Sequence, residues 1–129
     1  MGFFNARIQY NETLSHEMYA GADFLFMPSR VEPCGLNQMY AMRYGTVPVV
    51  RRIGGLQDTV IDFEDENGFG ICFQQVSIVD MLSGIDRGIQ LFKDSETLTL
   101  CRKRMMAVNN SWDNSAAEYI NIYNGLLGL

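Results

Sequence analysis

Short apolar runs alternate along the chain with segments in which apolar residues recur at helical spacing. Continuous apolar runs are typical of strands that are buried on both faces of a parallel sheet. The pattern predicts strands at residues 6–10, 23–27, 47–50 and 70–73. Between the first three strands it predicts helices over residues 13–20 and 37–44, with Asn11 capping the first and Gly21 and Gly45 as stop signals.

From residue 77 onward the pattern is helical. Ser77, followed three residues later by Asp80, resembles an N-terminal capping box. Three apolar stripes then follow at alternating steps of three and four residues, and each stripe predicts one face of a helix. The stripes are Ile78, Leu82, Ile85, Ile89 and Phe92, then Leu98, Cys101, Met105 and Val108, then Trp112, Ala116, Tyr119, Tyr123 and Leu126.

This order of elements predicts an α/β protein, with a parallel sheet flanked by helices and a helical C-terminal end. A doubly wound domain of this class normally has about six strands. Only three of the predicted strands alternate with helices, and the first of them begins almost at the start of the chain. We therefore expect residues 1–129 to be a partial Rossmann-like domain that is truncated at its N-terminal side.

Composition and charge exclude several classes of function. Lys and Arg number 10 against 15 Asp and Glu, which gives a net charge of −5 and no broad basic patch for nucleic acid or an anionic membrane. No apolar stretch approaches the length of a membrane span, and no signal-peptide pattern opens the chain. The three cysteines are not at metal-ligand spacing and His16 is the only histidine, so we expect no zinc site and a cytoplasmic location.

The segment 28–38, Pro-Ser-Arg-Val-Glu-Pro-Cys-Gly-Leu-Asn-Gln, carries the candidate chemistry. It joins a predicted strand to a helix, and ligands of open α/β sheets bind outside the carboxyl ends of the strands. The helix start near Asn37 offers unpaired N–H groups that favour phosphate. Glu32 can accept hydrogen bonds from sugar hydroxyls, and Gly35 lets a ligand approach the main chain. The pattern alone leaves open a tight loop with a solvated glutamate.

Residues 22–36, Ala-Asp-Phe-Leu-Phe-Met-Pro-Ser-Arg-Val-Glu-Pro-Cys-Gly-Leu, resemble the signature of bacterial glycogen synthases and plant starch synthases. Residues 38–48 and 49–60 resemble the same family, as do Ser111-Trp112 and the tyrosines that follow them. The resemblance implies the C-terminal portion of a GT-B fold, in which two Rossmann-like domains face each other across a cleft. It implies an enzyme that transfers glucose from a nucleotide sugar to the non-reducing end of an α-1,4-glucan with retention, without metal or cofactor.

The resemblance also implies roles for single residues. Glu32 would be the glutamate of the active site that contacts the donor, and Cys34, Gly35 and Leu36 would lie against the glucose and its phosphate.

Four further residues would complete the donor site. Asn37 and Gln38 would open the helix whose N-terminus faces the diphosphate, and Tyr10 would pack beside the base. Tyr40 stands where many GT-B enzymes have a ribose-binding glutamate, and tyrosine there is usual in the glycogen-synthase branch.

Several alternatives stay open at this point. The donor is ADP-glucose or UDP-glucose, and the rival functions are a nucleotide-sugar-binding module and another GT-B sugar-nucleotide enzyme. Arg51 and Arg52 either neutralise phosphate or, as we favour, fix the loop by pairing with Asp58. We expect the isolated chain to be inactive, because the glucan acceptor needs the N-terminal domain. A homo-oligomer is expected through the edge of the strand at 6–10.

Overall fold

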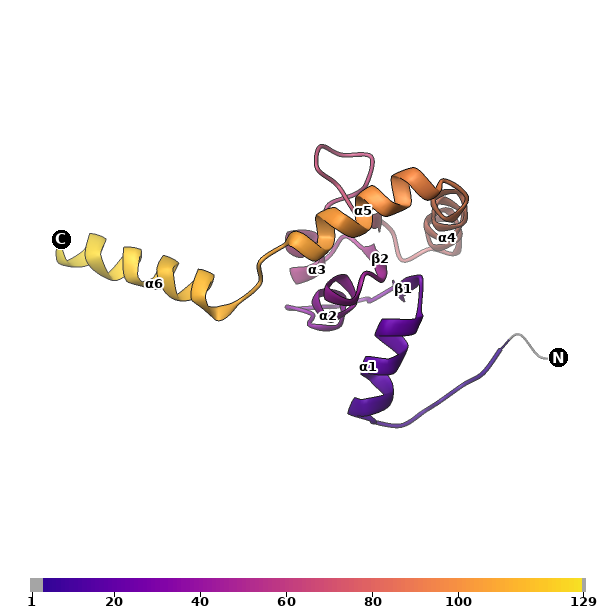
Figure 1. Cartoon of the computed structure of the whole chain (residues 1–129), viewed down its shortest axis with the longest axis horizontal. Helices are drawn as coiled ribbons and strands as arrows, with labels where there is room; N and C mark the ends of the chain where they lie inside the picture. The colour runs from indigo at the N-terminus through magenta and orange to yellow at the C-terminus, as the bar shows by residue number, and fades with distance from the viewer. Residues whose placement is uncertain (1–3, 129) are drawn as a thin grey trace.

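The computed structural model describes residues 4–128, which form three strands and six helices (Figure 1). The elements in chain order are α1 (Glu12–Gly21), β1 (Phe24–Met27), α2 (Asn37–Tyr44), β2 (Val47–Arg51), α3 (Gly55–Thr59), β3 (Ile71–Phe73), α4 (Ile78–Lys93), α5 (Ser95–Ala107) and α6 (Trp112–Leu127). The strands form one sheet in the order β1-β2-β3, and both pairs are parallel. The predicted α/β class with a parallel sheet is therefore confirmed.

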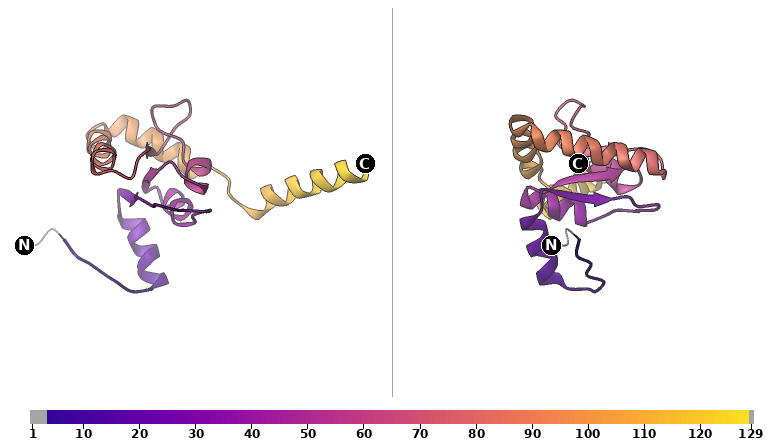
Figure 2. Two further views of the ribbon diagram at one scale, coloured as in Figure 1. Left: turned by 180° about the vertical axis from the view of Figure 1, so that it is seen from behind. Right: turned by 90° about the vertical axis from the view of Figure 1, so that its right-hand side faces the viewer.

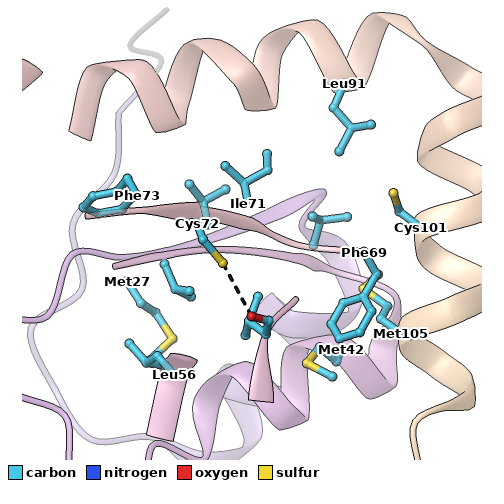
Figure 3. Packing of buried hydrophobic residues seen from close by; sticks show 14 of the residues in the cluster. Met27, Met42, Leu56, Phe69, Ile71, Cys72, Phe73, Leu91, Cys101 and Met105 are labelled. Atoms are coloured by element: carbon cyan, nitrogen blue, oxygen red, sulfur yellow. Dashed lines mark hydrogen bonds between the residues drawn. The ribbon is translucent and has the colours of Figure 1, made fainter. Parts of the chain in front are cut away.

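Helices cover both faces of this sheet (Figure 2). Helix α4 packs on β2 and β3, while α2 and α3 pack against β2, and α5 contacts both α2 and α4. Figure 3 shows the core between these layers, with Ile71 directed toward Leu91 of α4 and Leu56 and Met42 on the opposite side of the sheet. The carboxyl ends of all three parallel strands consequently lie along one edge of the sheet.

Local capping signals explain where the helices begin. The Asn11 side chain accepts a hydrogen bond from the Leu14 amide at 2.9 Å, as predicted. Ser77 accepts one from the Asp80 amide at 3.1 Å, and the Asp80 carboxylate in turn accepts one from the Gln75 amide at 2.8 Å. Each cap satisfies a backbone donor that the first helical turn leaves free.

A buried carboxylate holds the connection between α3 and β3. Asp62 is 5% exposed and accepts hydrogen bonds from the amides of Cys72 at 2.7 Å and Glu64 at 3.2 Å. Its other partner is the guanidinium of Arg87 on α4. Burial raises the pKa of Asp62, but the Arg87 hydrogen bond and the two backbone donors outweigh burial and hold the pKa below its ordinary value. The charged Asp62 carboxylate therefore links β3, the loop before it and α4.

The predicted strand at residues 6–10 is wrong. No strand is formed in residues 4–10, and the side chains of Ile8 and Tyr10 are 99% and 91% exposed. A strand needs a neighbour to pair with its backbone groups, and the described chain places none beside this segment. The edge strands of the sheet are instead β1 and β3, each of which has β2 as its one partner among the described strands.

The predicted apolar stripe of α4 exists, but it does not face the sheet. Gly84, Gly88 and Leu91 are buried against the sheet, whereas Ile85 and Phe92 are 40% and 53% exposed. Sequence periodicity marks an apolar face without saying what covers it. The exposed side lines an open apolar hollow of about 410 Å³ together with residues of β1 and β2, namely Phe24, Phe26 and Val49.

Helix α6 extends away from the sheet (Figure 1) and has no buried residue among those described. Its predicted apolar stripe is therefore exposed, with Trp112 at 82% and Leu126 at 79%. The preceding stripe behaves as an ordinary core face, since Leu98, Cys101 and Met105 of α5 are buried.

Candidate functional site

The loop that follows β1 leaves the sheet at the carboxyl end of the strands and leads into α2. Glu32 lies in this loop with its side chain half-buried, and Ser29 Oγ donates a hydrogen bond to Glu32 Oε2 at 3.3 Å. Cys34 and Leu36 are exposed on the same loop. The loop thus presents a carboxylate and an open main chain where ligands of parallel sheets bind.

The start of α2 carries backbone donors that nothing in residues 4–128 satisfies. The first hydrogen bond of the helix runs from the Tyr40 amide to the Leu36 carbonyl at 3.0 Å. Within the described chain the amides of Asn37, Gln38 and Met39 have no recorded acceptor, and Leu36, the N-cap residue, supplies none from its side chain. Asn37 is exposed, so this partially positive helix end is open to solvent and suits an anion.

The side chain of Gln38 is turned inward and holds the loop. It is fully buried, and its Nε2 donates hydrogen bonds to the Gly35 carbonyl at 2.9 Å, Thr59 Oγ1 at 3.1 Å and the Cys34 carbonyl at 3.3 Å. The whole residue is 0% exposed, so its backbone amide is buried as well, and Asn37 is the exposed residue at the start of α2. Gly35 has φ 73°, a left-handed conformation that favours glycine. Sequence reasoning placed Gln38 at the site but gave no signal for this inward direction.

Gly54 and Gly55 support the loop from beneath. The Gly55 amide lies 3.2 Å from the carbonyl oxygens of both Glu32 and Pro33. A Cβ atom on Gly54 would overlap the Glu32 carbonyl, and one on Gly55 would overlap the Cys34 carbonyl. The two glycines are therefore required for close approach of one backbone to another, which brings the start of α3 against the loop.

The two arginines that end β2 and follow it have separate partners. Arg51 donates to main-chain carbonyls of the loops after β1 and β3. Arg52 pairs with Asp65 at 2.9 Å on the surface. Arg51 therefore makes loop contacts of the structural kind that we favoured, but the expected partner Asp58 is wrong for both arginines, since Arg51 binds carbonyls and Arg52 binds Asp65.

Tyr40 belongs to an aromatic cluster between α1 and α2. His16 Nδ1 lies 3.1 Å from Tyr44 Oη, and the rings of His16 and Tyr19 lie 6.1 and 6.2 Å from that of Tyr40. Burial and the neighbouring Tyr40 raise the pKa of Tyr19. Tyr40 remains 45% exposed, so its ring is held by the cluster and still reaches solvent.

The structure does not bring every predicted residue together. Tyr10 lies on the extended segment before α1 and is exposed, so it packs against nothing in the described chain. An open groove of about 560 Å³ runs beside α2 and is lined by Leu36, Tyr40 and the segment from Ala107 to Trp112, among others. Glu32 and Cys34 do not line this groove; they lie on the loop at its end.

The remaining reactive groups do not form a second centre. Burial, together with the charge of Asp62, raises the pKa of the Cys72 thiol to about 11, which keeps it protonated. Within residues 4–128, no group of three His, Cys, Asp or Glu side chains is arranged to hold a metal ion. No helix in the same range combines the length and the apolar character needed to cross a membrane.

The fold and the loop define a Rossmann-like α/β domain with its candidate site at the carboxyl ends of the strands, and the comparison with protein families specifies its family. The family described as "Glycosyl transferases group 1" matches residues 7–103. This match covers more than half of the chain, so the chain belongs to the group 1 glycosyl transferase family.

The more particular likenesses are to glycogen, starch and sucrose-phosphate synthases. The chain is 55% identical over 123 residues to a glycogen synthase from Flavobacterium johnsoniae and 48% identical over 122 residues to one from Anaeromyxobacter sp.. The catalytic domain of starch synthase IV from Arabidopsis thaliana, bound to ADP and acarbose, superposes with a TM-score of 0.82 over 95% of this chain at 34% identity. Sucrose-phosphate synthase from Thermosynechococcus elongatus gives a TM-score of 0.63 over 85% of the chain at 30% identity.

The chain spans about a quarter of the length of these relatives. Each match includes 95% of this chain, but only 26% of the Flavobacterium johnsoniae enzyme and 26% of the starch synthase chain. The resemblance stated from residues 22–36 is thereby confirmed at the level of the family.

Proposed function

We propose that the chain is the C-terminal donor-binding portion of a glucosyltransferase that extends an α-1,4-glucan with glucose from ADP-glucose. The observation that carries this proposal is the unpaired amide end of α2, which is open to solvent at Asn37, directly after the Glu32 loop. A starch synthase catalytic domain that shares this fold was solved with ADP bound. UDP-glucose is the alternative donor, because nothing in the loop distinguishes the two bases.

In this proposal each part of the loop has one task. The N-terminus of α2, which is open at Asn37, stabilises the negative charge that develops on the leaving diphosphate. Fixed donors aimed at developing charge are among the strongest catalytic devices. Glu32 accepts hydrogen bonds from the glucose, while Cys34 and Gly35 lie against the sugar phosphate. Leu36 lies against the glucose and its phosphate as well, and Tyr40 extends the donor site toward the nucleoside. The reaction proceeds with retention.

The chain alone supplies one wall of such a site. All the residues assigned to the donor lie on the loop, on α2 or just before α1, and the chain spans about a quarter of the length of the synthases that it resembles. Positioning of two reactants contributes several kcal/mol to a transfer reaction, roughly 7–11 kcal/mol in good cases. We therefore propose that the isolated 129-residue chain binds nucleotide weakly and transfers little glucose, the acceptor being held by the N-terminal domain of the longer protein.

The test compares the full-length polypeptide that contains this segment with the isolated chain. Each is incubated with labelled ADP-glucose, and separately with UDP-glucose, plus maltodextrin, and incorporation of label into glucan is followed. Incorporation by the longer protein and none by the chain supports the proposal. Nucleotide-sugar binding without incorporation by either protein favours a binding module. Turnover by the chain near that of the longer protein refutes the proposal that the acceptor is held outside this chain.

We propose further that the isolated chain self-associates. The free edge of β1 adjoins the apolar hollow lined by Phe24, Phe26, Ile85 and Phe92. A free strand edge beside a continuous apolar surface invites pairing with a second copy. The edge differs from the one expected at residues 6–10, but the consequence is the same.

The free cysteines fit a reducing, cytoplasmic compartment.

A further inference from the structure

Arg51 is the last residue of the central strand and reaches both neighbouring loops. Its Nη1 donates hydrogen bonds to the Arg30 carbonyl at 3.0 Å and the Ser29 carbonyl at 3.3 Å, both in the loop after β1. Its Nε donates to the Gln74 carbonyl at 3.0 Å, directly after β3. Within residues 4–128 it has no carboxylate partner. One guanidinium thus joins the carboxyl ends of all three strands.

This arrangement fixes the loop at a second point. The far half of the loop, from Glu32 to Gly35, is held by the backbone of Gly54 and Gly55 and by the side-chain amide of Gln38. Arg51 holds its near half, two residues before Glu32. Val31 is the one residue between these two supports, and its neighbours on both sides are held by contacts from other elements.

We propose that Arg51 is a positioning residue that sets the donor loop, so that Glu32 and the α2 amides converge on one ligand. The inference rests on the proposed donor site for its consequence in binding, but not for its effect on the loop. Arg51 acts through main-chain carbonyls and does not itself touch the donor. A planar guanidinium donates in fixed directions to several acceptors, and the single ammonium of lysine does not reproduce that fork.

The rival role is direct neutralisation of phosphate by the charge of Arg51. The two roles differ in what lysine does. Arg51→Lys keeps the positive charge but loses the fork, so a phosphate contact would largely survive it and a positioning role would not. Arg51→Gln removes both. Arg52→Lys is the matched control, because Arg52 is next in sequence and pairs with the surface residue Asp65.

The experiment uses the isotope-labelled 129-residue chain and its three variants. Backbone ¹⁵N relaxation of residues 30–35 is measured without ligand, and the ADP dissociation constant is measured by calorimetry. We expect loop order parameters to fall from about 0.85 toward 0.6 in both Arg51 variants and to stay unchanged in Arg52→Lys. ADP affinity should fall about tenfold in both Arg51 variants, the equivalent of one charge-assisted hydrogen bond.

The outcomes separate the inference from the function on which it rests. An unchanged loop in both Arg51 variants, or wild-type ADP affinity in Arg51→Lys, overturns the positioning role. If the wild-type chain does not bind ADP while the loop still loosens, the donor assignment fails and the positioning of the loop stands. Should the variants not fold, the Arg51 guanidinium is observed in the wild-type chain. Separate, slowly rotating Nη signals support the three-carbonyl contact, and one averaged signal overturns it.

Discussion

Replacing Asp62 with asparagine tests how the site's framework is held. Asp62 offers both carboxylate oxygens to donors: one to the Cys72 amide, the other to the Glu64 amide and Arg87. Asparagine keeps the shape but has one acceptor oxygen, so its NH₂ group must face either a backbone amide or the guanidinium. Two donors then meet in a buried site, and the charge of Arg87 loses its buried partner.

The expected loss follows from the exposure of the two partners. Removing one member of a fully buried ion pair costs about 3–5 kcal/mol. Arg87 is 24% exposed at its side chain and keeps Glu64 as a second partner at 3.0 Å, which reduces the loss. We therefore expect Asp62→Asn to lower the free energy of unfolding by about 2–3 kcal/mol. The matched control, Asp65→Asn, removes an exposed pair with Arg52 and should cost no more than about 1 kcal/mol.

The assay is urea unfolding followed by circular dichroism at neutral pH, repeated at several protein concentrations because self-association raises apparent stability. The pH dependence supplies an independent check. The pKa of Asp62 is lowered in the folded chain, so its contribution is fully present above the unfolded pKa of about 3.9 and is lost as the pH falls through the folded value. The difference between wild type and Asp62→Asn should therefore shrink below about pH 4. A difference at neutral pH no larger than that of Asp65→Asn would refute the reasoning.

Three further predictions follow from the same geometry. Gly55→Ala should destabilise the chain by several kcal/mol or displace the donor loop, because its Cβ would overlap the Cys34 carbonyl. Gly125→Ala, with open space around it, is the control, and equal urea midpoints for the two variants would contradict the prediction. Ile89→Asp on the exposed face of α4 should shift light scattering toward monomer, and an unchanged mass would exclude this surface as the contact. Glu32→Gln in the full-length polypeptide should reduce glucose transfer at least a hundredfold with little change in melting temperature, and near-normal turnover would remove Glu32 from the active site.

The parts of the fold that sequence predicted well are set by local chemistry. Asn11 and Ser77 cap their helices with hydrogen bonds that span three residues, and Gly45 closes α2 in a left-handed conformation. The continuous apolar runs around Val49 and Ile71 are typical of strands of a covered sheet, and both form such strands. These signals act within a few residues, so they can be recognised directly in the amino-acid sequence.

The parts that failed or stayed hidden depend on groups far apart in the chain. The segment at 6–10 has strand-like composition but no neighbouring strand, and composition alone does not provide one. The inward turn of Gln38 depends on Thr59, 21 residues away, and the carbonyls bound by Arg51 lie 21 to 23 residues from it. Such long-range hydrogen bonds depend on how the sheet and its loops pack, so the local spacing of residues in the sequence does not predict them.

The central claim is that the start of α2 and its loop receive the phosphates of a nucleotide sugar. It is tested most directly by titrating the ¹⁵N-labelled chain with ADP and, in parallel, with adenosine, while following every backbone amide. We predict that ADP shifts the amides of Gly35 to Met39 and that adenosine, which has no phosphate, leaves them unchanged. Shifts confined to other regions at saturating ADP, or equal shifts of these amides with adenosine, would contradict it.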